Sequence, residues 1–416
     1  MIKKLLANQI LSGVFVVTIG SFIGSIFSYL LQLFLGRLLS LEDYGTFNTL
    51  LSFSCILGVL GGAFSNSVIK KVSSLKGECR FDTLTHLFWS LSFYCLLFGA
   101  LFGGLLIAFK GSLATFFNIS DTQALVSFSF LMGLTFLGTL PKAYLQGLLR
   151  FKALAFFGVF TAFIRFVLPI GAVYKGFGVD GVFGGMVLGA LLSYVVSIFL
   201  LNKNFEKCDR SEGLNIHYRN IINFVGPLIF IQVGLTFLNN VDVILVKRLF
   251  DGESAGIYAG VVTVGKVLLF GAGSVSTIMF PQVAEAFSSG KNPQKVLKKF
   301  LPLQLLMVIA GTLVFVLFPK LITVTMFGDR FLPAVQYIPL FTVFIGTYIL
   351  VNFFILYFMA VEKFGVTYIL GLGAILQTGL IWKFATSLDA VVNINVLVTA
   401  VVLLFLIGYY RSVNLD

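Results

Sequence analysis

The chain has 416 residues, of which 58% are hydrophobic and 11% are charged, and its formal net charge is +12. A soluble protein carries about 25% charged residues, so this composition, with a mean hydropathy of +1.01, excludes a soluble globular protein. We expect a multi-pass protein of the bacterial cytoplasmic membrane. The basic excess requires no nucleic-acid partner, because basic cytoplasmic loops of a membrane protein account for it.

Apolar windows follow one another from end to end, each close to the roughly 20 residues that a membrane helix needs. Twelve spans are predicted, at 13–35, 45–69, 86–109, 123–145, 153–174, 181–201, 221–246, 256–280, 301–326, 334–360, 364–386 and 390–410. With both termini in the cytoplasm, 19 of the 29 basic residues fall in inner segments and 8 in outer turns. The positive-inside rule therefore predicts cytoplasmic termini. No secretory cleavage site follows the basic start, so the first helix is expected to be retained.

Two segments, 31–53 and 242–264, look like copies of one helix–turn–helix unit. A shift of 211 positions pairs Arg37 with Arg248, Glu42 with Glu253, Gly45 with Gly256, and Phe47 with Tyr258. Such a repeat suggests two pseudo-symmetric lobes with a site between them, as in transporters. We expect an all-α fold with a six-helix lobe at 1–202, a cytoplasmic linker at 203–219 and a second six-helix lobe at 220–416.

Polar side chains form stripes on the first and seventh predicted helices, at spacings typical of one helix face. The stripes are Thr18, Ser21, Ser25, Ser28 and Gln32 on the first helix, and Gln232, Thr236, Asn239 and Asp242 on the seventh. The 211-residue shift superposes them, since Ser21, Ser25 and Ser28 fall on Gln232, Thr236 and Asn239. Such groups either join helices through hydrogen bonds or line an aqueous cavity. Joining helices is the stronger interpretation for Ser and Thr alone. The Gln, Asn and Asp residues favour the cavity.

Two basic residues lie near the middle of predicted spans. Arg165 is about 12 residues into the fifth helix and Lys266 about 10 residues into the eighth, which is roughly 15–18 Å deep. Such charges cost on the order of 2.5–3.5 kcal/mol and usually face a cavity or a counter-ion. Asp242 is the clearly embedded acid, and a structural ion pair between Arg165 and Asp242 is the alternative. A net cationic cavity of low dielectric favours an anionic cargo such as a diphosphate.

Basic residues also stand at helix ends, where they could extend a charged path or anchor the helices in the headgroup region. They are Arg37, Lys142, Lys247 and Arg248, and we interpret them as interfacial anchors. The four cysteines show no CxxC spacing and invite no disulfide, so we expect no metal site and no redox chemistry. No cofactor is expected.

The segments LGRLLSLEDYGTFNTL (35–50), VDVILVKRLFDGESAGIYAG (241–260) and MFPQVAEAFSSGKN (279–292) resemble the polysaccharide-biosynthesis, Wzx-type oligosaccharide flippases. These belong to the superfamily that includes multidrug and toxin extruders (MATE) and the lipid II flippase. The resemblance implies a MATE-like carrier that moves an undecaprenyl-diphosphate-linked oligosaccharide from the inner to the outer leaflet. It singles out Asp242 and the turn Glu253–Gly256–Tyr258.

We therefore predict a flippase for surface polysaccharide (O-antigen or capsule) rather than an enzyme. Arg165 and Lys266 would bind the diphosphate, the stripes would contact sugar hydroxyls, and Asp242 would couple to a proton or act as a counter-ion. Membrane lipids, a polymerase and a chain-length regulator are the expected partners. The alternatives are a cation-coupled multidrug antiporter of the same fold and a membrane polymerase or glycosyltransferase. An enzyme of that kind needs acid–base residues near a sizeable outer loop, whereas the outer turns here are short and His-free, with isolated acids such as Asp121, Asp180 and Asp329.

Overall fold

The computed structural model describes residues 9–78, 81–120, 122–202 and 229–412, and the regular structure in these ranges is helical. Within these described ranges, ten helices are long and apolar enough to cross a membrane. Two bent pairs bring the number to twelve if each pair is one span; they are Leu41–Val59 with Phe64–Gly77, and Ile229–Leu238 with Val241–Leu249. The predicted all-α, multi-pass membrane architecture is confirmed.

The chain divides into two compact units. The first comprises Met1–Leu39 and Leu60–Ile221, and the second comprises Ser40–Val59 and Ile222–Asp416. Helix α3 (Leu41–Gly77) contributes to both. The linker predicted at 203–219 lies outside the described residues, so the division into lobes at that segment stays a prediction.

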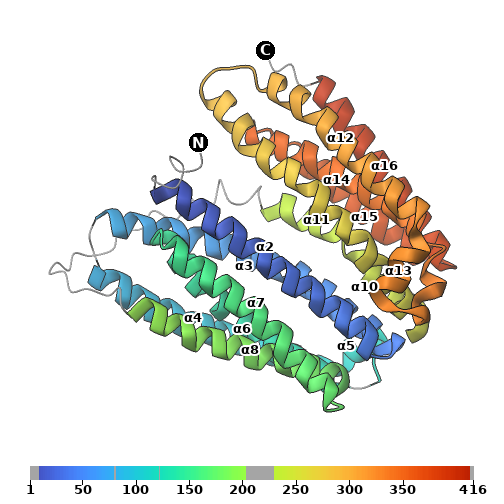
Figure 1. Cartoon of the computed structure of the whole chain (residues 1–416), viewed down its shortest axis with the longest axis horizontal. Helices are drawn as coiled ribbons and strands as arrows, with labels where there is room; N and C mark the ends of the chain where they lie inside the picture. The colour runs from blue at the N-terminus through green and yellow to red at the C-terminus, as the bar shows by residue number, and fades with distance from the viewer. Residues whose placement is uncertain (1–8, 79–80, 121, 203–228, 413–416) are drawn as a thin grey trace. The chain divides into compact units, whose positions relative to one another are not determined.

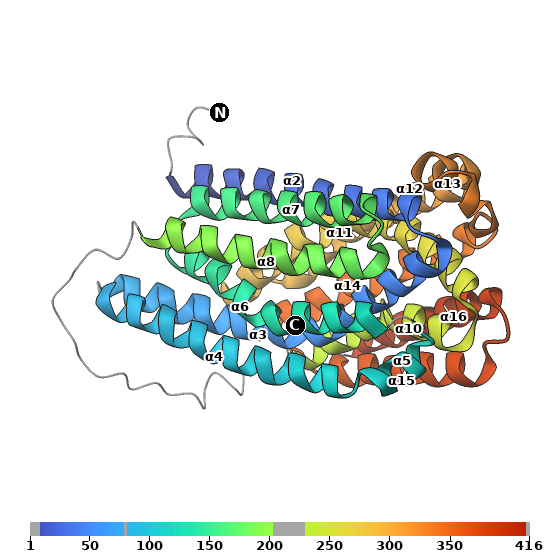
Figure 2. The same ribbon diagram turned by 90° about the horizontal axis from the view of Figure 1, so that it is seen from below.

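In the part of the first unit that the structure describes, there are the second part of α3 and six further helices. They are α2 (Gln9–Leu38), α4 (Phe81–Ala108), α5 (Lys110–Phe117), α6 (Thr122–Gly147), α7 (Phe151–Tyr174) and α8 (Gly178–Asn202). Helix α2 packs along α7, α7 along α8, and α4 along α6, which also contacts α8 (Figures 1 and 2). Helix α2 is therefore a peripheral helix of this unit and is held mainly by α7.

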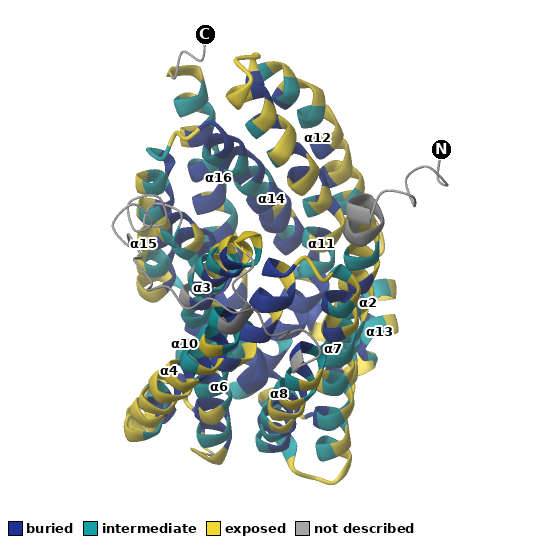
Figure 3. Cartoon of the chain, turned by 90° about the vertical axis from the view of Figure 1, so that its left-hand side faces the viewer, coloured by how far each residue is buried: buried dark blue, intermediate teal, exposed yellow. Residues whose placement is uncertain are grey.

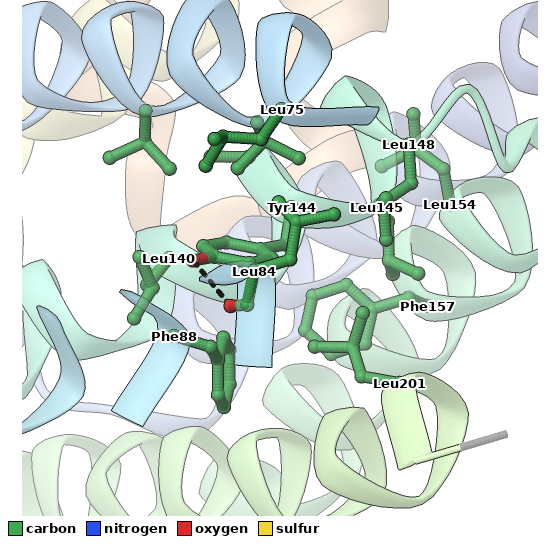
Figure 4. Packing of buried hydrophobic residues seen from close by; sticks show 13 residues of the cluster. Leu75, Leu84, Phe88, Leu140, Tyr144, Leu145, Leu148, Leu154, Phe157 and Leu201 are labelled. Carbon is green, nitrogen blue, oxygen red and sulfur yellow. Dashed lines mark hydrogen bonds between the residues drawn. The ribbon is translucent and has the colours of Figure 1, made fainter. Parts of the chain in front are cut away.

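A hydrophobic cluster joins α3, α4, α6 and α7 at one end of the first unit (Figure 4). The Tyr144 ring is buried at its centre, where its hydroxyl donates to the Leu84 carbonyl at 3.3 Å. Phe88 packs edge-on against that ring, with centroids 5.0 Å apart. Lys76 also donates to the Leu148 carbonyl at 2.6 Å. The Lys76 hydrogen bond attaches the end of α3 to the α6–α7 turn, and the Tyr144 contacts attach α6 to α4.

The second unit is built around two helices. Its labelled elements after α3 are α10 (Val241–Leu249), α11 (Gly252–Ser288), α12 (Pro293–Leu317), α13 (Pro319–Phe327), η1 (Asp329–Ala334), α14 (Ile338–Ala360), α15 (Val366–Phe384) and α16 (Leu388–Ser412). The most apolar windows of α11 and α14 are each 67% buried, against 17% for α12. Figure 3 shows the same contrast between α14 and α12. The core of this unit therefore lies along α11 and α14.

The span predicted at 301–326 is wrong in its second half. Helix α12 ends at Leu317, and Pro319 begins the separate helix α13. Proline lacks a backbone donor and fits the first turn of a helix better than its interior. The apolar composition continues across this break, so a hydropathy window cannot see it.

Candidate functional site

The seventh predicted helix is broken just before α10, where it meets the helix Ile229–Leu238 at a 44° bend. A break frees backbone carbonyl groups, and within a membrane other protein groups must satisfy them. The Tyr348 hydroxyl of α14 donates to the Leu235 carbonyl at 3.1 Å. Gln377 of α15 donates to the Leu238 carbonyl, also at 3.1 Å. Side chains from two neighbouring helices thus stabilise the break.

Asp242 follows the break in the first turn of α10 and is 1% exposed. Its Oδ2 accepts from the Tyr258 hydroxyl of α11 at 2.6 Å and from Asn395 Nδ2 of α16 at 3.0 Å. Gln377 in turn donates to Asn395 Oδ1 at 2.7 Å. We call these four residues the Asp242 cluster. The second carboxylate oxygen, Oδ1, is buried and has no hydrogen-bond partner, so the cluster offers an unfilled acceptor.

Lys266 reaches the same region from α11. Its side chain is half-buried, and its ammonium group donates to Asn240 Oδ1 at 3.1 Å. Asp242 and Cys55 of α3 lie within electrostatic range of that ammonium. Lys266, which is predicted to bind the diphosphate, and Asp242, which is predicted to be the coupling group, therefore lie near each other beside the helix break in the second unit.

In the remaining stripe of the seventh predicted helix, Gln232 and Thr236 precede the break and Asn239 lies within it. Gln232 is exposed, and Thr236 and Asn239 are half-buried. The expectation that Asp242 shares their face is wrong, because the break interrupts the helical register and turns Asp242 into the core of the unit. The Asn239 Oδ1 atom is buried without a hydrogen-bond partner.

In the first unit, Ser21, Ser25 and Ser28 are exposed on α2, and Gln32 is half-buried. The hydroxyl groups of Ser25 and Ser28 donate to carbonyl groups one turn earlier in α2, each at 3.0 Å. These two donors are used within the helix and therefore do not join α2 to a neighbour.

Arg165 is exposed in the middle of α7. Its aliphatic stem lies against α8, where a Cβ atom on Gly189 would be 3.7 Å from Arg165 Cγ. Arg165 and the α2 serines belong to the first unit, whereas Lys266 and Asp242 belong to the second.

The two copies of the sequence repeat start their helices with matching caps. Ser40 Oγ accepts from the Asp43 N–H at 3.1 Å at the start of α3. Asp251 Oδ2 accepts from the Ser254 N–H at 3.0 Å at the start of α11. Asp251 lies 211 positions after Ser40, and Ser254 lies 211 positions after Asp43. Such caps satisfy free backbone donors at the start of a helix. Hydrogen bonds from the Ser254 backbone and side chain lower the pKa of the Asp251 carboxyl.

Within the second unit, the two capped helices cross at equivalent glycines. A Cβ atom on Gly45 would lie 2.7 Å from the backbone nitrogen of Gly256. A Cβ atom on Gly256 would in turn overlap the Leu41 carbonyl. Further along, the Tyr44 hydroxyl pairs with Thr263 Oγ1 at 2.9 Å in a buried hydrogen bond. The glycines that the two repeat copies share are therefore the point where α3 and α11 cross.

The prediction that Lys247 is an interfacial anchor is wrong, because the residue is 1% exposed. Glu42 and Asp43 in the first turn of α3 lie within electrostatic range of the ammonium, together with Asp251. A burial cost for a charged side chain is offset when opposite charges surround it. The residues around Lys247 in the sequence do not indicate that the first turn of α3 lies nearby.

Sequence reasoning also missed Gln377 and Asn395. Each is an amide side chain in an apolar run, and polar residues inside a span are a recognised sign of function. Among the described residues, no group of three or more His, Cys, Asp or Glu side chains is arranged to hold a metal ion.

Comparison with solved structures shows which fold this is. An inward-facing multidrug resistance MATE-family transporter of the MOP superfamily aligns with a TM-score of 0.69 and 12% identity, covering 94% of this chain and 96% of that chain. The lipid II flippase MurJ, in an inward closed conformation, aligns with a TM-score of 0.67 and 14% identity, covering 95% and 87%. An outward-facing MATE transporter aligns with a TM-score of 0.58 and 14% identity, covering 98% of both chains. The predicted MATE-like fold is confirmed.

Sequence comparison gives the family. No curated protein sequence matches this chain. The family model described as polysaccharide biosynthesis protein matches residues 34–336, a region that contains most of the first repeat copy, the whole second copy, Arg165, Lys266 and Asp242. Because the match covers more than half of the chain, this multi-pass membrane protein belongs to the polysaccharide biosynthesis protein family.

Proposed function

We propose that the protein is a flippase that moves undecaprenyl-diphosphate-linked oligosaccharide units from the inner to the outer leaflet of the cytoplasmic membrane by alternating access. The observation that carries the proposal is the family match over residues 34–336, because it connects a transporter fold with polysaccharide biosynthesis. The similarity to a lipid II flippase supports the same kind of cargo. The product is a surface polysaccharide such as O-antigen or capsule.

In this proposal the basic residues in the two units bind the diphosphate. Lys266 presents an ammonium group at the polar helix break, and Arg165 presents a guanidinium group at the middle of α7. A phosphate group interacts more strongly with such charges in a low-dielectric setting than in water. Sugar hydroxyls bind to the polar stripe of α2 and to the stripe from Gln232 to Asn239.

Asp242 serves as the coupling group. Its unpaired Oδ1 accepts a proton or a small cation without loss of the bonds that Oδ2 makes to Tyr258 and Asn395.

The proposal also includes the orientation of the protein and its partners. Both termini lie in the cytoplasm, and a polymerase and a chain-length regulator use the flipped product.

A multidrug antiporter is the second candidate, because MATE transporters share the fold and a buried carboxylate suits a cationic cargo. The family match favours the flippase. Efflux of cationic dyes from cells that overproduce the protein would support the antiporter.

Substitution in cells tests the proposal. Lys266→Ala and Arg165→Ala are expected to abolish surface polysaccharide while the protein stays in the membrane at its normal abundance. Lys320→Ala, which removes an exposed basic residue of α13, is the matched control and is expected to leave polysaccharide unchanged. Normal polysaccharide in both test variants would exclude the diphosphate role.

A further inference from the structure

Asn240 contacts Lys266 beside the helix break. Its Nδ2 donates to the Thr236 carbonyl at 2.9 Å, which orients the amide. The opposite end of the amide, Oδ1, then accepts from the Lys266 ammonium. Asn240 thereby holds Lys266 in place two residues before Asp242.

The charged group that faces Asp242 is this same ammonium. The Tyr258 hydroxyl of α11, the Asn395 amide of α16 and the Val243 backbone N–H also surround Asp242, and Gln377 of α15 donates to Asn395 behind them. The carboxylate and the ammonium make no direct hydrogen bond, since Asp242 Oδ1 is without a partner and Lys266 donates to Asn240. Lys266 therefore neutralises Asp242 at a distance while its ammonium remains available to a second anion.

We propose that Asp242 and the phosphates of the cargo compete for Lys266, with Asn240 as the residue that positions the lysine between them. The inference rests on the proposed function, in which Lys266 binds the diphosphate. When Asp242 is charged, its carboxylate offsets part of the electrostatic attraction between Lys266 and the phosphates, and the cargo binds weakly. When a proton or cation neutralises Asp242, the cargo binds tightly.

This arrangement couples the cargo to the coupling ion without direct contact between them. Thermodynamic linkage requires that whatever neutralises Asp242 strengthens anion binding, and that a bound anion strengthens neutralisation by the same factor. The Asp242 cluster thereby regulates the substrate site, and Lys266 is the shared element.

Anion binding to the purified full-length protein tests the inference, with inorganic pyrophosphate as the calorimetric probe. Asp242→Asn, which removes the charge and keeps the size, is expected to raise pyrophosphate affinity by roughly 5- to 50-fold, within the usual range of coupling between sites. Lys266→Gln is expected to lose binding. The double variant is expected to bind no better than Lys266→Gln alone, because the gain acts through the lysine. Asp389→Asn, an exposed acid in the first turn of α16, is the matched control and should match the wild type.

A second variant covers the case in which Asp242→Asn does not fold. Asn395→Asp adds a carboxylate beside Asp242 and is expected to weaken pyrophosphate binding at least fivefold. Affinity that is unchanged or lower in a folded Asp242→Asn variant would overturn the competition and leave the diphosphate role intact. An absence of pyrophosphate binding in both the wild type and Asp242→Asn would overturn the diphosphate role of Lys266 itself.

Discussion

The crossing of α3 and α11 can be tested with one methyl group. In Gly45→Ala the new Cβ would lie 2.7 Å from the Gly256 nitrogen and 2.9 Å from the carbonyl carbon of Ala255, whereas ordinary contact begins near 3.4 Å. Both obstacles are backbone atoms, so no side chain can rotate away. The two helices must separate by about 0.7 Å, and the buried hydrogen bond between Tyr44 and Thr263 must lengthen or break.

The expected cost is the balance of two effects. Overpacking of a close contact destabilises by about 1–3 kcal/mol, and loss of a hydrogen bond adds about 1 kcal/mol. Replacing glycine by alanine within a helix returns roughly 0.5–1 kcal/mol. We therefore expect Gly45→Ala to be destabilised by about 1–3 kcal/mol. Gly58→Ala lies on the same helix with no atom within 4 Å of its Cβ, and is expected to be neutral or stabilised.

The assay is thermal unfolding of the two purified variants in detergent, followed by size-exclusion chromatography after heating. The unfolding midpoint of Gly45→Ala should lie below that of the wild type, and that of Gly58→Ala should not. Equal midpoints for the two variants would show that α3 and α11 do not cross at this glycine.

Three further predictions concern charged and polar groups of the second unit. The hydrogen bonds at the start of α11 lower the pKa of Asp251 from its ordinary value of 3.8. Its contribution to stability is therefore complete above that value and is lost as the pH falls through the lower folded-state pKa. Between neutral pH and about pH 3, the thermal unfolding midpoint should fall less for Asp251→Asn than for the wild type. An equal fall in the two proteins would refute the cap. Tyr258→Phe removes a hydrogen bond to the buried Asp242 carboxylate and should cost about 1.5–3 kcal/mol, whereas Tyr368→Phe, at a residue 79% exposed, should cost nothing measurable in the same unfolding assay. Lys247→Glu places a fourth acid among three acidic neighbours and should remove the protein from the membrane fraction in immunoblots. Lys247→Met keeps the apolar stem and should be retained, and equal abundance of the two variants would refute the electrostatic role.

Much of the fold could be predicted from sequence because its signals are local. The number of spans follows from the length of apolar runs, and the register of the repeat follows from residues that both copies keep. Gly45 and Gly256 illustrate this. The 211-residue shift that aligns them in sequence also aligns the caps of their helices, and the two glycines are in contact in the structure.

The site was less predictable because it depends on a break in a helix. A single face for the stripe from Gln232 to Asp242 requires a continuous helix. The bend before α10 separates Asp242 from that face, and the side chains that stabilise the break come from α14 and α15, more than 100 residues later. The burial of Lys247 could not be predicted for a similar reason, because Glu42 and Asp43, which lie near its ammonium, come from a distant part of the sequence.

Flipping in proteoliposomes that contain only the purified protein decides what this family member transports. A fluorescent undecaprenyl-diphosphate oligosaccharide placed in one leaflet should become accessible to an enzyme on the other side, and Lys266→Ala should slow that exchange to the rate of protein-free vesicles. Exchange of the lipid no faster than in protein-free vesicles, together with movement of a cationic dye against a proton gradient, would show instead that the protein is an antiporter.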